Sequence, residues 1–173
     1  MSREIIQKLE SWRRFDSVLH GPAHWARVHR FGLALGRGLE LNQSAMRCIE
    51  VFSWTHDLAR VDDGGGRVHA LDGADYLYEV APEVFPALDP QELGVISRAI
   101  RHHSDGLTAD VAWRQGLLSG CDWKPETVVL VTGCCWDADR LDLLRLGRKP
   151  RADKMSTPFW EDVYPLARRL HGM

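Results

Sequence analysis

The chain has 173 residues, a length that fits one domain and allows roughly 70% of the unfolded surface to be buried. Charged residues make up 27% of the sequence and the formal net charge is −2, so no basic footprint for nucleic acid is expected. The most apolar run, residues 128–136, is about half as long as a bilayer span requires. The first segment is amphipathic rather than an apolar leader, and the four cysteines include no C-x-x-C pair. We therefore expect a cytoplasmic, single-domain protein over residues 1–173 that binds neither nucleic acid nor membrane.

Apolar residues recur at helical spacing along most of the chain, and no run alternates polar and apolar residues as a half-buried strand does. The predicted helices, in chain order, span residues 2–15, 22–39, 42–60, 67–80, 91–103, 108–119, 125–146 and 158–170. Pro22 suits a first helical turn, Gly106 suits a helix end, and the glycines of residues 62–66 predict a loop. The valines in 125–146 would also suit a strand, but the segment is too long for one. The sequence thus predicts an all-α domain.

Residues that can ligate a metal fall near the ends of separate predicted helices. They are His24 early in the second helix, His56 and Asp57 late in the third, His69 at the start of the fourth and His102 and His103 at the end of the fifth, with Asp139 inside the seventh. Helices packed in a bundle can aim such side chains at one point. Imidazole and carboxylate ligands suit Fe, Mn, Zn, Co or Mg, and coordination offsets the cost of burying them. The pattern therefore predicts a divalent metal ion in the core.

Three stretches resemble the metal-dependent HD superfamily of phosphohydrolases: HWARV from His24, HDLAR from His56 and DADRLD from Asp137. The resemblance covers about residues 18–147, and the longer stretches LHGPAHWARV and CWDADRLDLLRLG are similar to small, stand-alone bacterial HD proteins. It implies an HD-domain helical bundle with a metal site in its core.

The resemblance also implies a ligand set. Carried over to this sequence, the ligands of one metal are His24, His56, Asp57 and Asp139. Asp137 competes with Asp139, but on a helix their side chains point roughly 200° apart, so only one can face the metal. The family pattern has the aspartate directly before Arg-Leu, which favours Asp139.

Whether the centre holds one metal or two stays open at this stage. The sequence is similar to the HD-GYP phosphodiesterases in carrying His69 and then His102-His103, which would hold a second metal with Asp57 as the bridge. Alternatively, one metal is bound and these histidines contact phosphate or support the ligands. Neighbouring helical residues diverge by about 100°, so both members of the pair converge only if the helix ends there.

In an HD phosphohydrolase the metal activates a water that attacks phosphorus, here in a phosphomonoester or phosphodiester of a nucleotide-like small molecule. Asp57 and Arg60 are the expected catalytic residues, because Arg60 lies one turn after Asp57 and a guanidinium suits phosphate. Arg60 stands where HD-GYP proteins have lysine and where HD nucleotidases have glutamate, and the GYP motif is absent. Further candidates for contact with substrate are His20, Arg101 and Asp137. His29 is expected to be structural, and His171 is expected to have no role.

Two other functions are compatible with the same residues. HD-fold mixed-valent di-iron oxygenases share the ligand order and act on a small polyol or phosphonate. A non-catalytic metal- and nucleotide-binding module is the second alternative, although the full ligand set argues against it. A phosphohydrolase is the preferred hypothesis, and the sequence does not indicate the oligomeric state.

Overall fold

The structure, a computed structural model, describes all residues 1–173 and contains α-helices and two short 3₁₀ helices but no strand. The elements are α1 (Arg3–Trp12), α2 (Pro22–Gly38), α3 (Gln43–Thr55), α4 (Val68–Val84), α5 (Pro90–His102), α6 (Ala109–Arg114), α7 (Pro125–Leu141), η1 (Asp142–Leu146), η2 (Ala152–Lys154) and α8 (Trp160–Leu170). The all-α prediction is confirmed. None of these helices combines the length and the apolar character that crossing a membrane would need.

Local sequence signals start most of the helices. The Asn42 side chain accepts a hydrogen bond from the Ala45 amide (2.9 Å) at the start of α3. At the start of α5, Asp89 and Glu92 form a reciprocal capping box. Proline occupies the first turn of α2, α5 and α7, where its missing N–H costs nothing. These caps explain why the predicted helix starts agree with the structure to within a residue or two.

Several helices end earlier than predicted: α3 at Thr55 rather than residue 60, α6 at Arg114 rather than 119, and α7 at Leu141 rather than 146. The end of α4 differs in the other direction, for a local reason. We expected the fourth helix to end at Val80, ahead of a proline-rich stretch, but α4 continues through Pro82 to Val84. Pro82 has no N–H to donate to the carbonyl of residue 78, one turn earlier. Tyr78 is 50% exposed, so its backbone lies on the solvent side of the helix. Water can therefore satisfy the carbonyl, and the proline is tolerated in the last turn.

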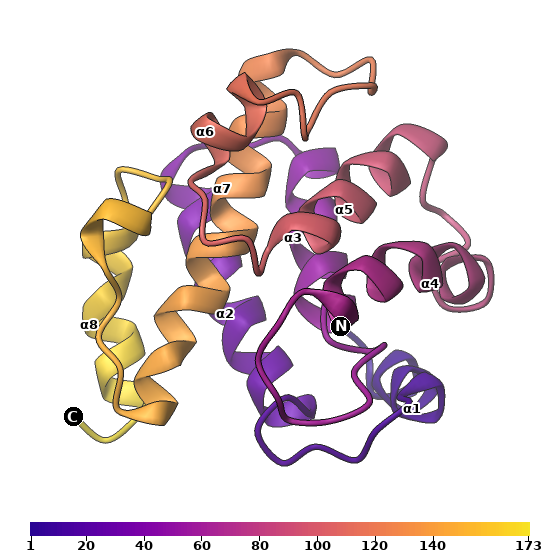
Figure 1. Cartoon of the computed structure of the whole chain (residues 1–173), viewed down its shortest axis with the longest axis horizontal. Coiled ribbons are helices and arrows are strands. Elements are labelled where there is room, and N and C mark those ends of the chain that lie inside the picture. Colours follow the sequence, from indigo (N-terminus) through magenta and orange to yellow (C-terminus); the bar gives the residue numbers. More distant parts are fainter.

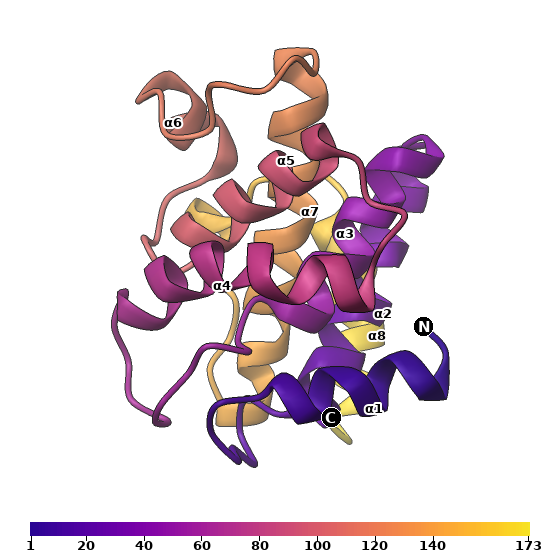
Figure 2. The ribbon, with the colours of Figure 1, turned by 90° about the vertical axis from the view of Figure 1, so that its right-hand side faces the viewer.

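The helices form a bundle in which α3 packs against α2, α5 and α7 (Figure 1). In Figure 2, α4 runs alongside α5, and α1 lies at the edge of the molecule next to α4. On the opposite side, α8 covers α7 and α2. The indole N–H of Trp136, in the middle of α7, donates to the carbonyl of Ala99 in α5 (2.8 Å), which links two of the central helices. The arrangement brings α2, α3, α5 and α7 around one buried region.

Gly32 allows α2 and α3 to approach closely, and replacing it should destabilise the bundle. An added Cβ would lie 2.6 Å from Cγ2 of Ile49, which is fully buried and has no room to move. Exchanging a helical glycine for alanine gains about 0.5–1 kcal/mol, whereas overpacking a core costs about 1–3 kcal/mol. Gly32→Ala is therefore expected to lower the free energy of unfolding in urea by about 1–2 kcal/mol.

The matched control is Gly94→Ala in α5. Its Cβ would meet only Nη1 at the end of the Arg98 side chain, at 2.9 Å, which can shift at the cost of its hydrogen bonds to nearby carbonyls. This variant should therefore change the stability by less than about 1 kcal/mol in either direction, because the helical propensity of alanine offsets that cost. Equal stability of the two variants would contradict the close contact of α2 with α3.

Candidate metal centre

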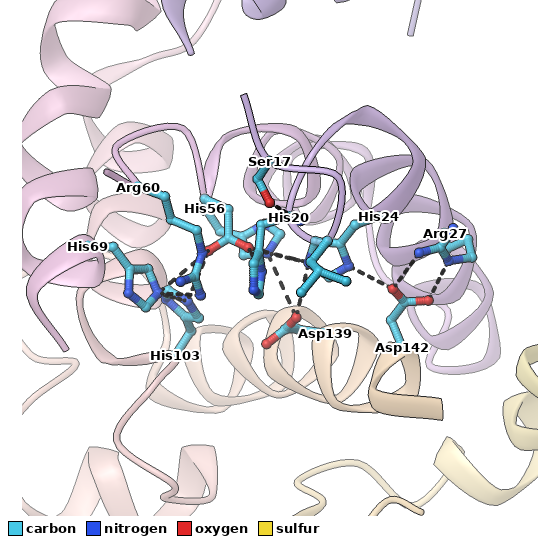
Figure 3. A network of polar contacts seen from close by, with 12 residues as sticks. Ser17, His20, His24, Arg27, His56, Arg60, His69, His103, Asp139 and Asp142 are labelled. Carbon is cyan, nitrogen blue, oxygen red and sulfur yellow. Dashed lines mark hydrogen bonds and ion pairs between the residues drawn. The ribbon is translucent and has the colours of Figure 1, made fainter. Parts of the chain in front are cut away.

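Four predicted ligands from three helical regions meet at one buried point (Figure 3). His24 lies in the first turn of α2, His56 and Asp57 directly follow α3, and Asp139 is in the last turn of α7. The Nε2 atoms of His24 and His56 are 3.1 Å apart. Both lie 3.4–3.5 Å from Oδ2 of Asp57 and 3.4–3.8 Å from Oδ1 of Asp139. Neighbouring ligands of an ion with bonds of about 2.1 Å are themselves about 3.0–3.4 Å apart, so the geometry suits a metal.

The two histidines turn their Nε2 atoms to this point because their Nδ1 atoms are engaged elsewhere. Nδ1 of His24 is 2.7 Å from Oδ2 of Asp142, and Nδ1 of His56 is 3.3 Å from the Phe52 carbonyl. Both partners are acceptors, so each Nδ1 donates its proton away from the cluster and each Nε2 faces into it. Two ring nitrogens facing each other at 3.1 Å need a positive charge between them, either a proton on one ring or a metal ion that displaces it. The residues present therefore fit a bound metal ion.

The charge distribution also favours a cation here. Burial lowers the tendency of His24 to be protonated, but its contacts with Asp139, Asp142 and Asp57 outweigh burial and raise its pKa to about 10. Burial would raise the pKa of Asp57, yet the surrounding histidines, His56 foremost, hold it well below its usual value. The pKa of Asp139 is lowered in the same way, by His24 and His56 against burial. The carboxylates thus stay ionised and create a negative field at the cluster.

Asp142 is a supporting residue to which the sequence analysis assigned no role. It is fully buried and accepts hydrogen bonds from His24 and from Nε of Arg27 (2.7 Å each). It also lies 3.0 Å from Nε2 of His171, beyond the end of α8. Such an outer partner fixes the ring orientation of a ligand. Its position three residues after Asp139, on the same face of α7, is a signal that a helical pattern can reveal.

A second group of donors lies beside the first. It comprises Oδ1 of Asp57 and the Nε2 atoms of His69 and His103, which are 3.1–3.8 Å apart. Nδ1 of His103 is 2.6 Å from the carbonyl of Ile100, so its Nε2 also presents a lone pair. Burial, together with the charges of His103 and Arg60, lowers the pKa of His69 to about 3, which keeps this imidazole neutral. Asp57 therefore faces both groups, with one oxygen turned to each.

Arg60 lies within this second group. Its Nε donates to Oδ1 of Asp57 (2.7 Å), Nη2 lies 3.1 Å from Nε2 of His69, and Nη1 donates to the carbonyl of Gly64 (3.0 Å). Only 8% of the residue is exposed. The predicted position of Arg60 close to Asp57 and facing the site thus agrees with the structure.

A cavity of about 490 Å³ opens above both groups of donors. Asp57, Asp139, His69 and His103 lie at its floor, and Gly64–Gly66 form part of its wall. His20 also lines the cavity, with Nδ1 2.9 Å from Oδ2 of Asp57. The cavity also contacts four cationic side chains: Arg60, Arg140, Arg145 and Arg148. The candidate ligands are therefore accessible to a small molecule.

The sequence matches no protein-family model and no curated protein. The structure is similar to a crystal structure described as a predicted HD superfamily hydrolase from an uncultured Thermotogales bacterium, with a TM-score of 0.58 and 20% sequence identity. The similarity covers 97% of this chain and 87% of the other. The chain has the HD-domain fold. The fold and the clustering of histidine and aspartate in its core agree with the predictions.

His102 does not join the cluster of this HD domain. Helix α5 ends at His102, and only the ring of His103 turns inward. Nδ1 of His102 is instead 2.8 Å from Oδ2 of Asp105, which also binds Arg67 (3.0 Å). The prediction that both neighbouring histidines converge is corrected, because the backbone stays helical through His103 (φ −62°, ψ −28°) and the two side chains therefore diverge by about 100°.

Asp137 and Arg101 also lie apart from the cluster and the cavity. Asp137 accepts hydrogen bonds from the backbone amides of Ser156 and Thr157 (2.7–3.0 Å), and burial raises its pKa. Arg101 pairs with Asp75 on the surface. Both predictions of substrate contact are corrected. The choice of Asp139 over Asp137 agrees with the geometry, since the two carboxylates face opposite sides of α7.

Three substitutions should differ in how strongly they weaken metal binding: one of a metal ligand, one of a residue that supports a ligand, and one of a residue outside the site. Asp57→Asn removes a charged donor and is expected to weaken the binding of Mn²⁺ more than about 100-fold. Asp142→Asn leaves every metal donor in place but weakens the support of His24, and should cost about 10–100-fold. Asp75→Asn, on the surface, should have no effect. Isothermal titration calorimetry measures all three, and unchanged affinity in Asp57→Asn would place the metal elsewhere.

Proposed function

We propose that the protein is a metal-dependent phosphohydrolase acting on a phosphomonoester or phosphodiester of a small, nucleotide-like molecule. The observation that carries the proposal is a buried cluster of histidine and aspartate at the floor of an arginine-lined cavity. The HD fold and the description of its structural neighbour as a predicted hydrolase support the class of reaction. The donor set suits Fe, Mn, Zn, Co or Mg.

The first group of donors, which consists of His24, His56, Asp57 and Asp139, would hold the metal. His24 and His56 supply neutral nitrogen donors, and Asp57 and Asp139 supply charge. When bound, a divalent ion activates water and neutralises charge on phosphoryl oxygens. Asp142 keeps the His24 ring in place, and His20 contacts Asp57 at the mouth of the cavity, where it can contact a substrate.

The arginines supply the expected recognition of phosphate. A guanidinium has five N–H groups, and three contacts engage Arg60, so two remain for substrate oxygens. Arg145 is held at the cavity by the carbonyls of Leu19 (3.2 Å) and Asp142 (3.1 Å). Arg148 is exposed at the mouth. Cations at the floor and at the mouth together favour an anionic ligand.

The size of the cavity favours a small substrate. Its volume of about 490 Å³ is within the range of about 300–1,000 Å³ typical of small-molecule sites. The wall contains the Gly64–Gly66 stretch, and Asp63 of the same loop accepts a hydrogen bond from Ser17. The loop is therefore attached to the segment that carries His20. A mononucleotide or a similar phosphate ester suits this space.

The test is metal analysis of protein purified without chelators, followed by assays of phosphate-ester hydrolysis with added Mn²⁺, Co²⁺, Fe²⁺ or Mg²⁺. Phosphate release is measured for nucleoside monophosphates and p-nitrophenyl phosphate, and formation of the nucleoside monophosphate is measured for cyclic nucleotides. We expect hydrolysis that disappears with EDTA and returns when metal is restored. Asp139→Asn should abolish it, whereas Asp75→Asn should leave it unchanged.

Two results would favour the alternatives. Two irons per chain, oxygen consumption and no phosphate release would identify an oxygenase. Tight binding of a nucleotide without turnover by any metal form would identify a binding module. Either result overturns the phosphohydrolase proposal.

Arg148 should affect binding of substrate rather than the chemical step, because it lies at the mouth of the cavity. Arg148→Ala is expected to raise KM about 3–10-fold and to change kcat less than about twofold, the signature of lost uniform binding. Arg151→Ala is the matched control, since this exposed arginine pairs with Asp153 (2.7 Å) outside the cavity. Steady-state kinetics with one phosphate ester measure both. An unchanged KM in Arg148→Ala would contradict the role.

A further inference from the structure

The two groups of donors differ in one respect. No arginine contacts the histidines of the first group, whereas the second group of Asp57, His69 and His103 includes the guanidinium of Arg60. This arginine contacts two of the three atoms that would ligate a second ion: Oδ1 of Asp57 at 2.7 Å and Nε2 of His69 at 3.1 Å. We propose that the Arg60 guanidinium occupies the position of a second cation, so that the centre binds a single metal ion, at His24, His56, Asp57 and Asp139. This inference rests on the metal centre of the proposed function and specifies its stoichiometry.

A second metal ion and Arg60 would compete for the same lone pair of His69. The Nε2 atom of a neutral imidazole has a single lone pair, which can either accept a hydrogen bond or ligate a metal. In the structure Nη2 of Arg60 lies at hydrogen-bond distance from this nitrogen of His69. A metal at the same place would have to displace the guanidinium. While the guanidinium stays, His69 is not available as a ligand, and Oδ1 of Asp57 and Nε2 of His103 alone form an incomplete set.

The positive charge of Arg60 also opposes binding of a second divalent cation. A guanidinium keeps its positive charge at any pH that the protein tolerates, and it repels a divalent cation placed among its own contacts. Burial makes this repulsion stronger than at a surface, and Arg60 is only 8% exposed. The negative charge available to the second group is that of Asp57, which it shares with the first group. Arg60 already neutralises the Oδ1 side of this carboxylate.

Hydrogen bonds on both sides hold the Arg60 guanidinium in the second group. Nη1 of Arg60 donates to the carbonyl of Gly64 at 3.0 Å, and Nε donates to Asp57, so the guanidinium is fixed at both ends. In Figure 3 Arg60 lies beside His69 and His103 at the left of the network, and His24 lies at the right. The loop beyond α3 therefore holds the arginine in the second group. The two N–H groups that remain can contact a substrate oxygen, as a second metal would.

Metal stoichiometry tests the inference independently of activity. The wild-type chain is saturated with Mn²⁺, freed of excess ions by gel filtration and analysed by mass spectrometry of the metal and by electron paramagnetic resonance. We expect about one Mn²⁺ per chain with the six-line spectrum of an isolated ion. Arg60→Met removes the charge and the donors and should raise the content to about two, with a spin-coupled spectrum. Arg67→Gln, an exposed arginine paired with Asp105, is the matched control and should stay at one.

A second variant tests the inference should Arg60→Met fail to fold. His69→Ala removes a donor from the second group only and should still bind one Mn²⁺ with an unchanged spectrum. Two ions in the wild type, or one ion in a folded Arg60→Met, would overturn the role of Arg60 and leave the metal centre intact. No bound metal in the wild type would instead overturn the proposed function as well.

Discussion

Asp57 is a buried carboxylate whose two oxygens face different partners, and the polar centre of the protein depends on how its charge is compensated. Oδ2 lies within 3.5 Å of His24 and His56, while Oδ1 accepts a hydrogen bond from Arg60. An uncompensated carboxylate in this position would cost several kcal/mol. The histidines, a bound cation and the guanidinium together offset that cost. The same charges draw an anionic substrate into the cavity above them.

The surrounding helices provide the rigidity that such a centre requires. Asp142 at the end of α7 connects the ring of His24 with Arg27 in α2 and with His171 beyond α8. A ligand on the N-terminal turn of one helix is thus supported by residues from the opposite end of the chain. The close packing of α2 against α3 at Gly32 keeps the two ligand histidines in register. The positions of the ligands therefore depend on how the helices pack.

Sequence periodicity and caps were enough to predict where the helices lie and begin. The HD resemblance was enough to select His24, His56, Asp57 and Asp139. The direction of individual side chains and the contacts between distant residues could not be predicted from the sequence, because they depend on how each helix is rotated and packed. The inward turn of His103, without His102, depends on the residue at which α5 ends. The contact of His171 with Asp142 joins positions 29 residues apart, across a turn that no periodicity encodes.

The most direct test of the account is anomalous diffraction at the manganese edge from crystals grown with Mn²⁺. The account predicts one peak per chain, bounded by Nε2 of His24 and His56 and by Asp57 and Asp139, with the Arg60 guanidinium still in contact with Asp57. A second peak between His69 and His103 would contradict the role of Arg60. Absence of any peak at the His24–His56 cluster would contradict the metal centre itself.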